Sequence, residues 1–445
     1  MLSYYLRLAL KSFARTPGLT ALMVCAIGFG IAGCVMILTV YHTESGNPIW
    51  WKNDRLYAVT MDSYDPAQPA DKKHPSLPPA QLTYMDASYV HSSRIPQRSV
   101  VMFKSGGVLS GGIVDRKPVP VIARVTTSDF FAMFDVPFLY GSGWNASADS
   151  APAPQIVISR KENTQLFGGI NSVGRTIRWN DHEFRIVGVL NSWNPLPKFY
   201  DLNNGPFDDT EDVYIPFGWA QALQLQTAGS SSCWGAQEVK TYRDLLGSEC
   251  LWIQMWVELP NKAALGRMQG FLDSYWSEQH RAGRFQRPRN NRLTNVDQWL
   301  ADNDVVGNDD RVLVGLAFAF FAVCLINSVG MLLAKFLNGA AITGVRRALG
   351  ASRRDVFTQH LVEVGALSAT GALLGLGLSY LGLWGVRELH SLSATIGSGV
   401  QELARMDGTS VIVTMLLAIV AALAAGLYPA WRVGRLPPAV YLKSQ

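Results

Sequence analysis

Long apolar runs divide this chain of 445 residues into parts suited to a membrane and parts suited to water. Crossing about 30 Å of hydrocarbon takes about 20 helical residues, and four runs are long enough to do so. They predict four transmembrane helices, at residues 19–41, 312–334, 361–386 and 410–428. We therefore expect a membrane protein with one large α+β domain, residues 42–311, between its first and second spans.

Short periodic stretches within residues 42–311 predict both strands and helices. Alternating apolar and polar residues on either side of Asn180 and Asp181 predict a hairpin of residues 175–179 and 183–190. Residues 191–212, rich in Asn, Asp, Pro and Gly, should form a loop. Two further strands and two helices are expected at residues 155–159, 213–216, 161–167 and 265–281.

Basic residues at three places predict the orientation of the spans. Residues 1–18 carry three basic residues and no acid, and residues 431–445 do the same. The loop at residues 335–360 carries five basic residues. Because Lys and Arg are retained on the cytoplasmic side, we expect this loop and both termini in the cytoplasm. Residues 42–311 and the short loop at residues 387–409 then lie outside, and residues 429–445 form a cytoplasmic tail.

The first 18 residues have the pattern of a helix lying along the membrane surface. Arg7, Lys11 and Arg15 recur every four residues and form one basic stripe, opposite apolar residues. The alternative is a plain cluster of flanking charges.

Overall composition agrees with a membrane anchor that carries a large water-exposed domain. Charged residues make up 16% of the chain, against about 25% in a typical soluble protein. The net charge of +5 comes from the clusters beside the spans, so it reflects membrane orientation and does not argue for nucleic acid binding.

The loop between the second and third spans contains the sequence GVRRALGASRRD, residues 344–355. Gly350 suits the left-handed conformation that ends a helix, and Ser352 and Asp355 have the spacing of a capping box that starts the next one. We interpret the segment as a short basic helix whose exposed apolar side chains bind a cytoplasmic protein. The alternative is an ordinary basic loop. The residues expected to make this contact are Gly344, Val345, Arg346, Arg347, Ala348, Leu349 and Gly350.

Glycines inside the spans predict close helix packing. Gly371 and Gly375 form a G-x-x-x-G pair in the third span, either within one subunit or between subunits. The first span contains G-x-G-x-x-G at residues 28–33, but the motif lies inside an apolar run, so packing is favoured over nucleotide binding. Glu363, near the cytoplasmic end of the third span, has either a functional role or, as we favour, reaches the interface or pairs with Arg353 or Arg354.

Cysteines and catalytic motifs add little chemistry. Cys233 and Cys250 both lie in the outer segment, where an oxidising compartment would favour a disulfide; two separate buried thiols are the alternative. The sequence contains no G-x-x-x-x-G-K-[ST], no H-E-x-x-H, no C-x-x-C and no G-x-S-x-G. We expect no catalytic residues, no metal site and no cofactor in this chain.

Five segments of the chain resemble the MacB/FtsX-type permeases, members of the mechanotransmission (type VII) ABC transporter superfamily. They resemble the family's opening helix and first span, two signatures of its core domain, its coupling helix with the third span, and the C-terminal segment in which the chain leaves the last span. These segments are residues 8–32, 125–144, 156–190, 345–378 and 426–442.

The resemblance implies a fold and a set of partners. It implies a multi-pass protein of the bacterial inner membrane, with residues 42–311 as a MacB-like periplasmic core domain. It also implies a dimer of permeases served by a separate ATPase dimer, which would bind the ATP and Mg²⁺; we expect no ATPase domain fused to this chain. Ala341, Ile342 and Thr343 stand where the family often has Arg-Glu-Ile, so a homodimer and a heterodimer both stay open.

The resemblance also implies a non-enzymatic role in transport. ATP-driven motion would pass to the periplasmic domain and export a substrate from the periplasm through an adaptor and a TolC-like outer-membrane channel. The alternatives are FtsX-like signalling to cell-wall hydrolases and Lol-like lipoprotein extraction.

Overall fold

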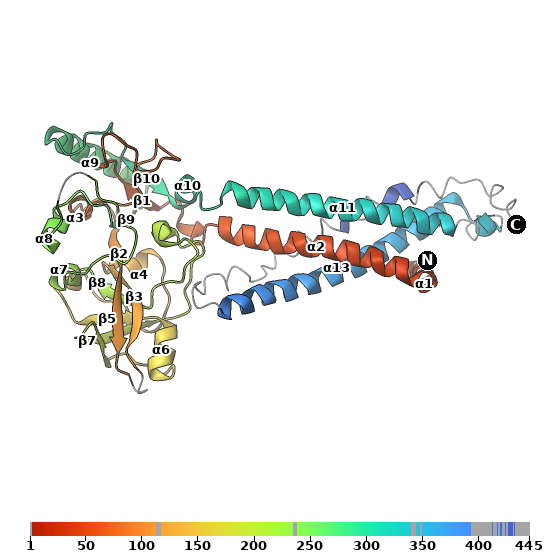
Figure 1. The fold of residues 1–445 in the computed structure, drawn as a ribbon, viewed down its shortest axis with the longest axis horizontal. Helices are drawn as coiled ribbons and strands as arrows, with labels where there is room; N and C mark the ends of the chain where they lie inside the picture. The colour runs from red at the N-terminus through yellow and green to blue at the C-terminus, as the bar shows by residue number, and fades with distance from the viewer. Residues whose placement is uncertain are drawn as a thin grey trace. The chain divides into compact units, whose positions relative to one another are not determined.

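The computed structural model describes residues 2–112, 117–234, 238–339, 344–347 and 349–392, with short helical stretches between residues 412 and 431 (Figure 1). The chain forms two compact units. Gly46–Val305 is one unit, here called the sheet domain. Met1–Ser45 and Val306–Gln445 together form the other, here called the helical unit.

The sheet domain is built on a mixed sheet of ten described strands in the order β10-β1-β9-β2-β3-β8-β5-β7-β4, with β6 pairing with β2 and β7. The β3–β8 and β5–β7 pairs are parallel and the other pairs are antiparallel. The strands are β1 (Leu56–Thr60), β2 (Arg98–Ser110), β3 (Val119–Thr126), β4 (Phe138–Gly141), β5 (Gln155–Ile158), β6 (Thr176–Trp179), β7 (His182–Leu190), β8 (Val213–Pro216), β9 (Gln254–Glu258) and β10 (Arg292–Asn295).

Both faces of this sheet are covered by apolar side chains. Val101 and Phe103 of β2 pack into one core cluster, whereas Val100 and Met102 of the same strand pack into the other. Because successive side chains of a strand point to opposite faces, a strand buried on both sides reads as a continuous apolar run. The sheet is therefore the middle layer of the domain.

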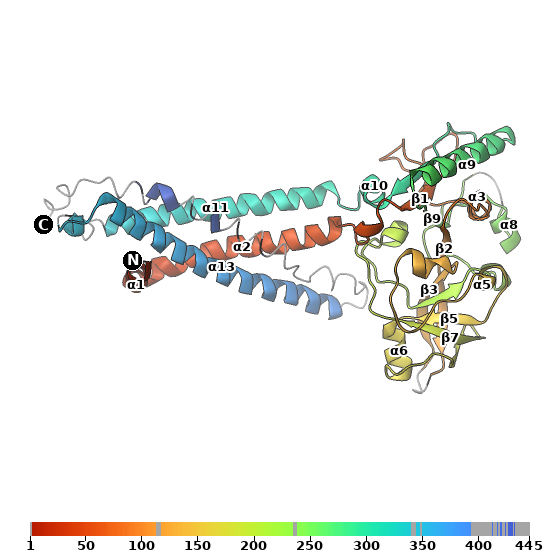
Figure 2. The same cartoon turned by 180° about the vertical axis from the view of Figure 1, so that it is seen from behind.

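Helices and 3-10 turns cover the faces and edges of the sheet. The long helix α9 lies beside β10 (Figure 1), and Figure 2 shows it from behind next to β1. The helical elements of the domain are η1 (Trp50–Lys52), α3 (Tyr84–His91), α4 (Asp129–Met133), α5 (Ser147–Ser150), α6 (Arg160–Phe167), η2 (Phe199–Asn204), α7 (Trp219–Ala222), α8 (Tyr242–Leu246), α9 (Lys262–Arg281) and α10 (Val296–Asp302).

Several elements predicted from the sequence are confirmed. Strand β8 has the predicted bounds, and β6 and β7 pair antiparallel across Asn180 and Asp181, whose φ angles of 48° and 65° are left-handed. Helix α6 is capped by Ser159 and ends at Gly168 with φ 67°. The predicted loop at residues 191–212 contains one short 3-10 helix, η2, that the pattern did not indicate.

The long helices of the helical unit are α1 (Leu2–Arg15), α2 (Pro17–Ser45), α11 (Asn308–Asn338) and α13 (Arg353–Leu392). Among the described residues, three helical stretches are long and apolar enough to span a membrane: Pro17–Lys52, Asp310–Asn338 and Arg353–Gly385. The predicted fourth span, residues 410–428, falls mostly outside the described residues, as do residues 432–445 of the predicted tail.

Helix α13 is longer than the span predicted at residues 361–386. It begins at Arg353 and continues to Leu392, so the start of the predicted loop at residues 387–409 is helical; the remainder of that loop lies outside the described residues. Likewise, residues 335–338 belong to α11 and not to the predicted loop at 335–360. Hydropathy marks only the apolar part of a helix, whereas backbone hydrogen bonds continue into its polar ends.

Helix α2 packs against both α11 and α13, and the three run side by side (Figure 1). Ile27, Ile31 and Val35 of α2 form a buried cluster with Phe321 of α11 and Ala372 of α13. A second cluster near the other end of the contact joins all three helices. Apolar residues all round α2 thus find partners on two sides.

Candidate functional site

The turn that precedes α13 has the local structure that its sequence predicts. Residues Gly344–Arg347 are helical, and Gly350 has φ 106°, a left-handed value that favours glycine. The N–H of Gly350 donates to the carbonyl of Arg347 at 3.2 Å, which closes the turn. The helix therefore stops where the glycine allows the chain to reverse.

A capping box then starts α13. The backbone N–H of Asp355 donates to Ser352 Oγ at 3.2 Å, and the backbone N–H of Ser352 donates to Asp355 Oδ2 at 3.0 Å. These bonds satisfy two backbone donors that a helix start leaves unpaired. The predicted helix, stop and new helix are confirmed for the described part of this segment.

Two exposed apolar side chains project from this turn. The side chain of Leu349 is 82% exposed and that of Val345 is 49% exposed. The N–H of Leu349 donates to the carbonyl of Val345 at 3.0 Å, so the two residues are held one turn apart. Ala348 and the residues 340–343 lie outside the described residues. We call Val345 and Leu349 the exposed pair.

A side-chain hydrogen bond fixes the turn onto α13. Arg346 Nη1 donates to Gln359 Oε1 at 2.9 Å. On the other side, Tyr5 of α1 lies 3.5 Å from the carboxylate of Asp355. The exposed pair therefore projects from a braced turn.

Behind this turn, a buried carboxylate joins three helices. Glu363 of α13 forms an ion pair with Lys335 of α11 at 2.8 Å and accepts a hydrogen bond from Ser12 of α1 at 2.5 Å. His360 Nδ1 lies 3.6 Å from the same carboxylate, and the Lys335 ammonium lies over the ring of Phe13. We call Ser12, Lys335, His360 and Glu363 the polar cluster.

The polar cluster corrects one prediction. Glu363 was expected to reach the interface or to pair with Arg353 or Arg354, but it is buried and pairs with Lys335, which the sequence indicated only as an orientation charge. Arg353 and Arg354 are exposed in the first turn of α13, whereas Glu363 lies more than two turns further along the helix. Lys335 comes close because α11 continues beyond its apolar run.

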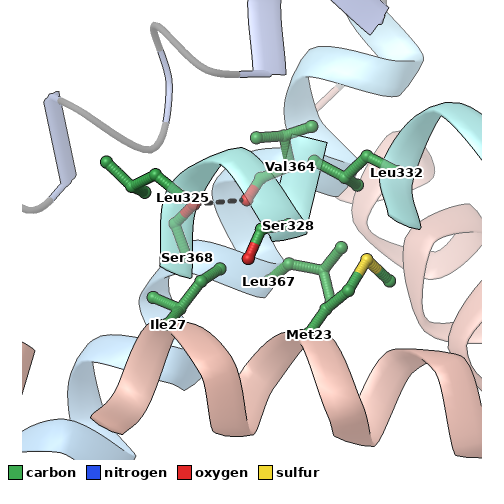
Figure 3. Close-up of a pocket in the computed structure, with 8 residues that line it drawn as sticks. All are labelled: Met23, Ile27, Leu325, Ser328, Leu332, Val364, Leu367 and Ser368. Atoms are coloured by element: carbon green, nitrogen blue, oxygen red, sulfur yellow. Dashed lines mark hydrogen bonds between the residues drawn. The ribbon is translucent and has the colours of Figure 1, made fainter. Parts of the chain in front are cut away.

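A small cavity lies between α2, α11 and α13 (Figure 3). Its volume is about 10 Å³, close to the least that holds one water molecule. Both hydroxyls in its lining bond to the backbone of their own helices: Ser328 to Cys324 and Ser368 to Val364. It is lined by Met23, Ile27, Leu325, Ser328, Leu332, Val364, Leu367 and Ser368.

Glycines bring α2 and α13 into close contact. A Cβ at Gly371 would lie 2.9 Å from Ile27 Cβ, and one at Gly375 would lie 2.9 Å from the carbonyl oxygen of Gly28. Neither position has room for a side chain, as small-residue helix contacts in membranes require. The predicted packing face therefore contacts α2 of the same chain.

Two further polar features lie in the sheet domain. Cys233 and Cys250 are joined by a disulfide, the pairing expected from the sequence. Elsewhere, the buried guanidinium of Arg124 pairs with both Asp201 and Glu211, and Lys198 lies 3.5 Å from Glu211.

This buried pair of carboxylates is matched in charge by the two cations. Although burial alone would raise the pKa of Glu211, Arg124 and Lys198 lower it to about 2. Tyr200 also donates its hydroxyl to Glu211 at 3.1 Å. No sequence pattern indicates this group, because its members are spread from β3 to the loop before β8. Within the described ranges, no group of His, Cys, Asp or Glu residues could hold a metal ion.

Comparison with known proteins defines the class of this chain. The family described as MacB-like periplasmic core domain matches residues 20–270, and the FtsX-like permease C-terminal family matches residues 313–438. The chain belongs to the MacB/FtsX-type ABC transporter permeases. It is a multi-pass membrane permease, and its sheet domain is the periplasmic α+β domain of that family.

Individual relatives are distant. The chain is 23% identical to the pyoverdine export ATP-binding/permease protein PvdT of Pseudomonas aeruginosa, over 96% of this chain and 56% of that protein. It is 23% identical to the macrolide export ATP-binding/permease protein MacB of Bdellovibrio bacteriovorus, over 63% of this chain and 37% of that protein. The chain therefore spans about half or less of the length of these relatives.

Among solved structures, the periplasmic region of MacB from Actinobacillus actinomycetemcomitans aligns with 56% of this chain and 92% of that chain, at 12% identity and a TM-score of 0.35.

Proposed function

We propose that this chain is the non-catalytic membrane subunit of an ABC transporter and that the segment Gly344–Gly350 docks into a groove on a separate ATPase subunit. The observation that carries the proposal is the exposed pair on a braced turn between two membrane helices. Burying one leucine side chain contributes about 1.5–3 kcal/mol, which is enough to matter in a transient contact. ATP and Mg²⁺ would bind to the ATPase and not to this chain.

Motion of the ATPase would pass through the helical unit as a rigid movement. The turn is bonded to α13, and the polar cluster ties α13 to α1 and α11. The close contact at Gly371 and Gly375 ties α13 to α2, and α2 continues in the chain directly into the periplasmic domain. Movement of the turn would in this way reach the periplasmic domain.

The topology that this function requires has four spans and both termini in the cytoplasm. The basic clusters at residues 1–18, 335–360 and 429–445 support it, because such residues are retained on the cytoplasmic side. Residues 410–428 would supply the fourth span, and residues 1–18 would lie along the inner membrane surface.

Export from the periplasm is the role we favour. The names of PvdT and of MacB describe export of pyoverdine and of macrolides, and this supports export over cell-wall signalling or lipoprotein extraction for this chain. The complete assembly would hold two permeases, alike or different, two ATPase subunits, a periplasmic adaptor and a TolC-like channel.

Co-purification tests the docking proposal. Tagged wild-type chain and the Leu349→Asp variant are solubilised from membranes of the native organism, and bound proteins are identified by mass spectrometry. We expect an ABC ATPase with the wild-type chain and a loss of at least tenfold with Leu349→Asp. Ile170→Asp is the matched control, because Ile170 is also an exposed apolar residue but lies in the periplasmic domain.

The outcomes are distinct. An ATPase retained by Ile170→Asp but lost by Leu349→Asp supports docking at the turn. Equal recovery of the ATPase with Leu349→Asp and with wild type would exclude the exposed pair as the docking site.

A further inference from the structure

Two neighbouring tryptophans stand out on the surface of the periplasmic domain. Trp50 is 71% exposed and Trp51 is 52% exposed, and their rings meet edge to face at 5.9 Å. Both belong to η1, which follows shortly after the end of α2 at Ser45. Large adjacent aromatic surfaces of this kind mark sites of interaction with a partner or a membrane.

The segment that carries the two tryptophans is held firmly. Ile49 is buried in the core of the domain, and Lys52 Nζ donates to the carbonyls of Ala132 and Met133 at 3.1 and 3.0 Å. Trp51 Nε1 donates to a carboxylate oxygen of Asp135 at 2.9 Å. The indole rings therefore project from a fixed base, with their exposed parts available for contact.

The tryptophans lie at the edge of the domain where the chain enters and leaves. Asn47 and Asn53, on either side of η1, each donate a hydrogen bond of 2.7 Å to Asp297 of α10. Helix α10 is the last element before the chain continues into α11. Both covalent connections to the membrane helices therefore leave the domain beside Trp50 and Trp51.

The length of chain keeps this edge near the bilayer. Trp50 follows Ser45 by five residues, which at about 3.5 Å per residue limits their separation to about 18 Å. The headgroup layer lies directly outside the hydrocarbon, and Trp is enriched there because its ring is apolar and its N–H is polar. A lipid surface is thus within reach of the tryptophans and suits their chemistry.

We propose that Trp50 and Trp51 insert into the headgroup layer of the outer leaflet and anchor this edge of the periplasmic domain to lipid. The proposal requires that α2 spans the membrane, but it does not depend on how the chain contacts an ATPase. The two ideas can therefore fail separately.

Fluorine NMR of the full chain in nanodiscs tests the proposal. The chain is labelled with 5-fluorotryptophan, and Trp50→Phe and Trp51→Phe assign the two resonances by their disappearance. Spectra are recorded with a nitroxide carried on the lipid headgroup and, separately, with a water-soluble gadolinium chelate. Trp384, exposed on the apolar helix α13, is the control expected to contact lipid, and Trp234, whose indole donates to the carbonyl of Ser63 within the periplasmic domain, is the control expected to lie away from lipid.

We expect the headgroup nitroxide to remove most of the intensity of the Trp50 and Trp51 resonances while the Trp234 resonance keeps its intensity. Broadening of Trp50 and Trp51 by gadolinium alone would place them in water and overturn the proposal. Resonances that neither agent broadens would place the tryptophans in a protein interface, such as a second copy of the chain, and would overturn it equally.

Discussion

At the residue scale, Glu363 shows how far sequence patterns identify an interaction. Its position near the end of a span predicted that it reaches the interface or pairs with Arg353 or Arg354, whereas the structure places it in the buried polar cluster with Lys335. Its partner could not be predicted, because the pairing depends on the rotation of α11 relative to α13. A hydropathy profile contains no information on that angle.

Removing the charge of Glu363 should destabilise the helical unit. Glu363→Gln leaves the Lys335 ammonium buried without a counter-charge, and breaking a buried pair in this way costs about 3–5 kcal/mol. We expect a lower midpoint of thermal unfolding, followed by circular dichroism in detergent. The double variant Glu363→Leu with Lys335→Met removes both charges and should recover much of the loss. A Glu363→Gln variant that unfolds with the wild type would contradict the role of the ion pair.

The lowered pKa of Glu211 predicts how the stability of the periplasmic domain depends on pH. Its pKa is about 2 in the folded chain, below its ordinary value of 4.5, because Arg124 and Lys198 outweigh the effect of burial. A carboxyl group whose pKa is lowered on folding stabilises the folded chain at pH values above its ordinary pKa. This stabilisation is lost as the pH falls toward the pKa that the group has in the folded chain. We therefore expect the free energy of unfolding to fall between pH of about 4.5 and 2.

Two variants separate this contribution from those of other acids. Glu211→Gln should be less stable near neutral pH and should depend less steeply on pH in this window. Glu183→Gln, at an exposed position of β7, should keep the wild-type profile. Denaturant titrations followed by tryptophan fluorescence would measure both, and equal slopes for wild type and Glu211→Gln would contradict the assignment.

At the scale of elements, the sequence pattern predicted the neighbouring strands β5, β6, β7 and β8 and missed the other strands of the sheet. The β6–β7 hairpin and α6 carry turn and cap residues that mark their ends, and both are confirmed. The central strands β2 and β9 were not predicted. They are buried on both faces, so they lack the alternation that identifies a half-buried strand.

Because of the contact between α2 and α13, we expect opposite effects on stability from alanine substitution at two glycines of α13. Gly375→Ala would place a Cβ 2.9 Å from the Gly28 carbonyl oxygen, and such overpacking typically costs 1–3 kcal/mol. A Cβ at Gly377 would meet nothing within 4 Å, so Gly377→Ala should gain about 1 kcal/mol of helix propensity. Thermal unfolding in detergent should rank Gly377→Ala at or above wild type and Gly375→Ala below it. The reverse order would contradict this packing.

At the scale of the whole molecule, the sequence predicted the class of protein more fully than its assembly. The resemblance of residues 125–144 and 345–378 to a permease family is confirmed by the family matches. Three of the four predicted spans correspond to described apolar helices, and the fourth stays a prediction. Partners, substrate and stoichiometry are properties of surfaces that meet other chains, and folding of one chain does not fix them.

The most direct test of the central claim is photo-crosslinking from the turn in living cells. A photoreactive amino acid replaces Leu349, which is 82% exposed, and in a second strain it replaces Ile170 of the periplasmic domain. The account predicts that irradiation joins position 349 to an ABC ATPase and that position 170 gives no such adduct. If position 349 crosslinks only to lipid, or to no protein in cells that express the ATPase, the claim that this turn couples the permease to an ATPase is wrong.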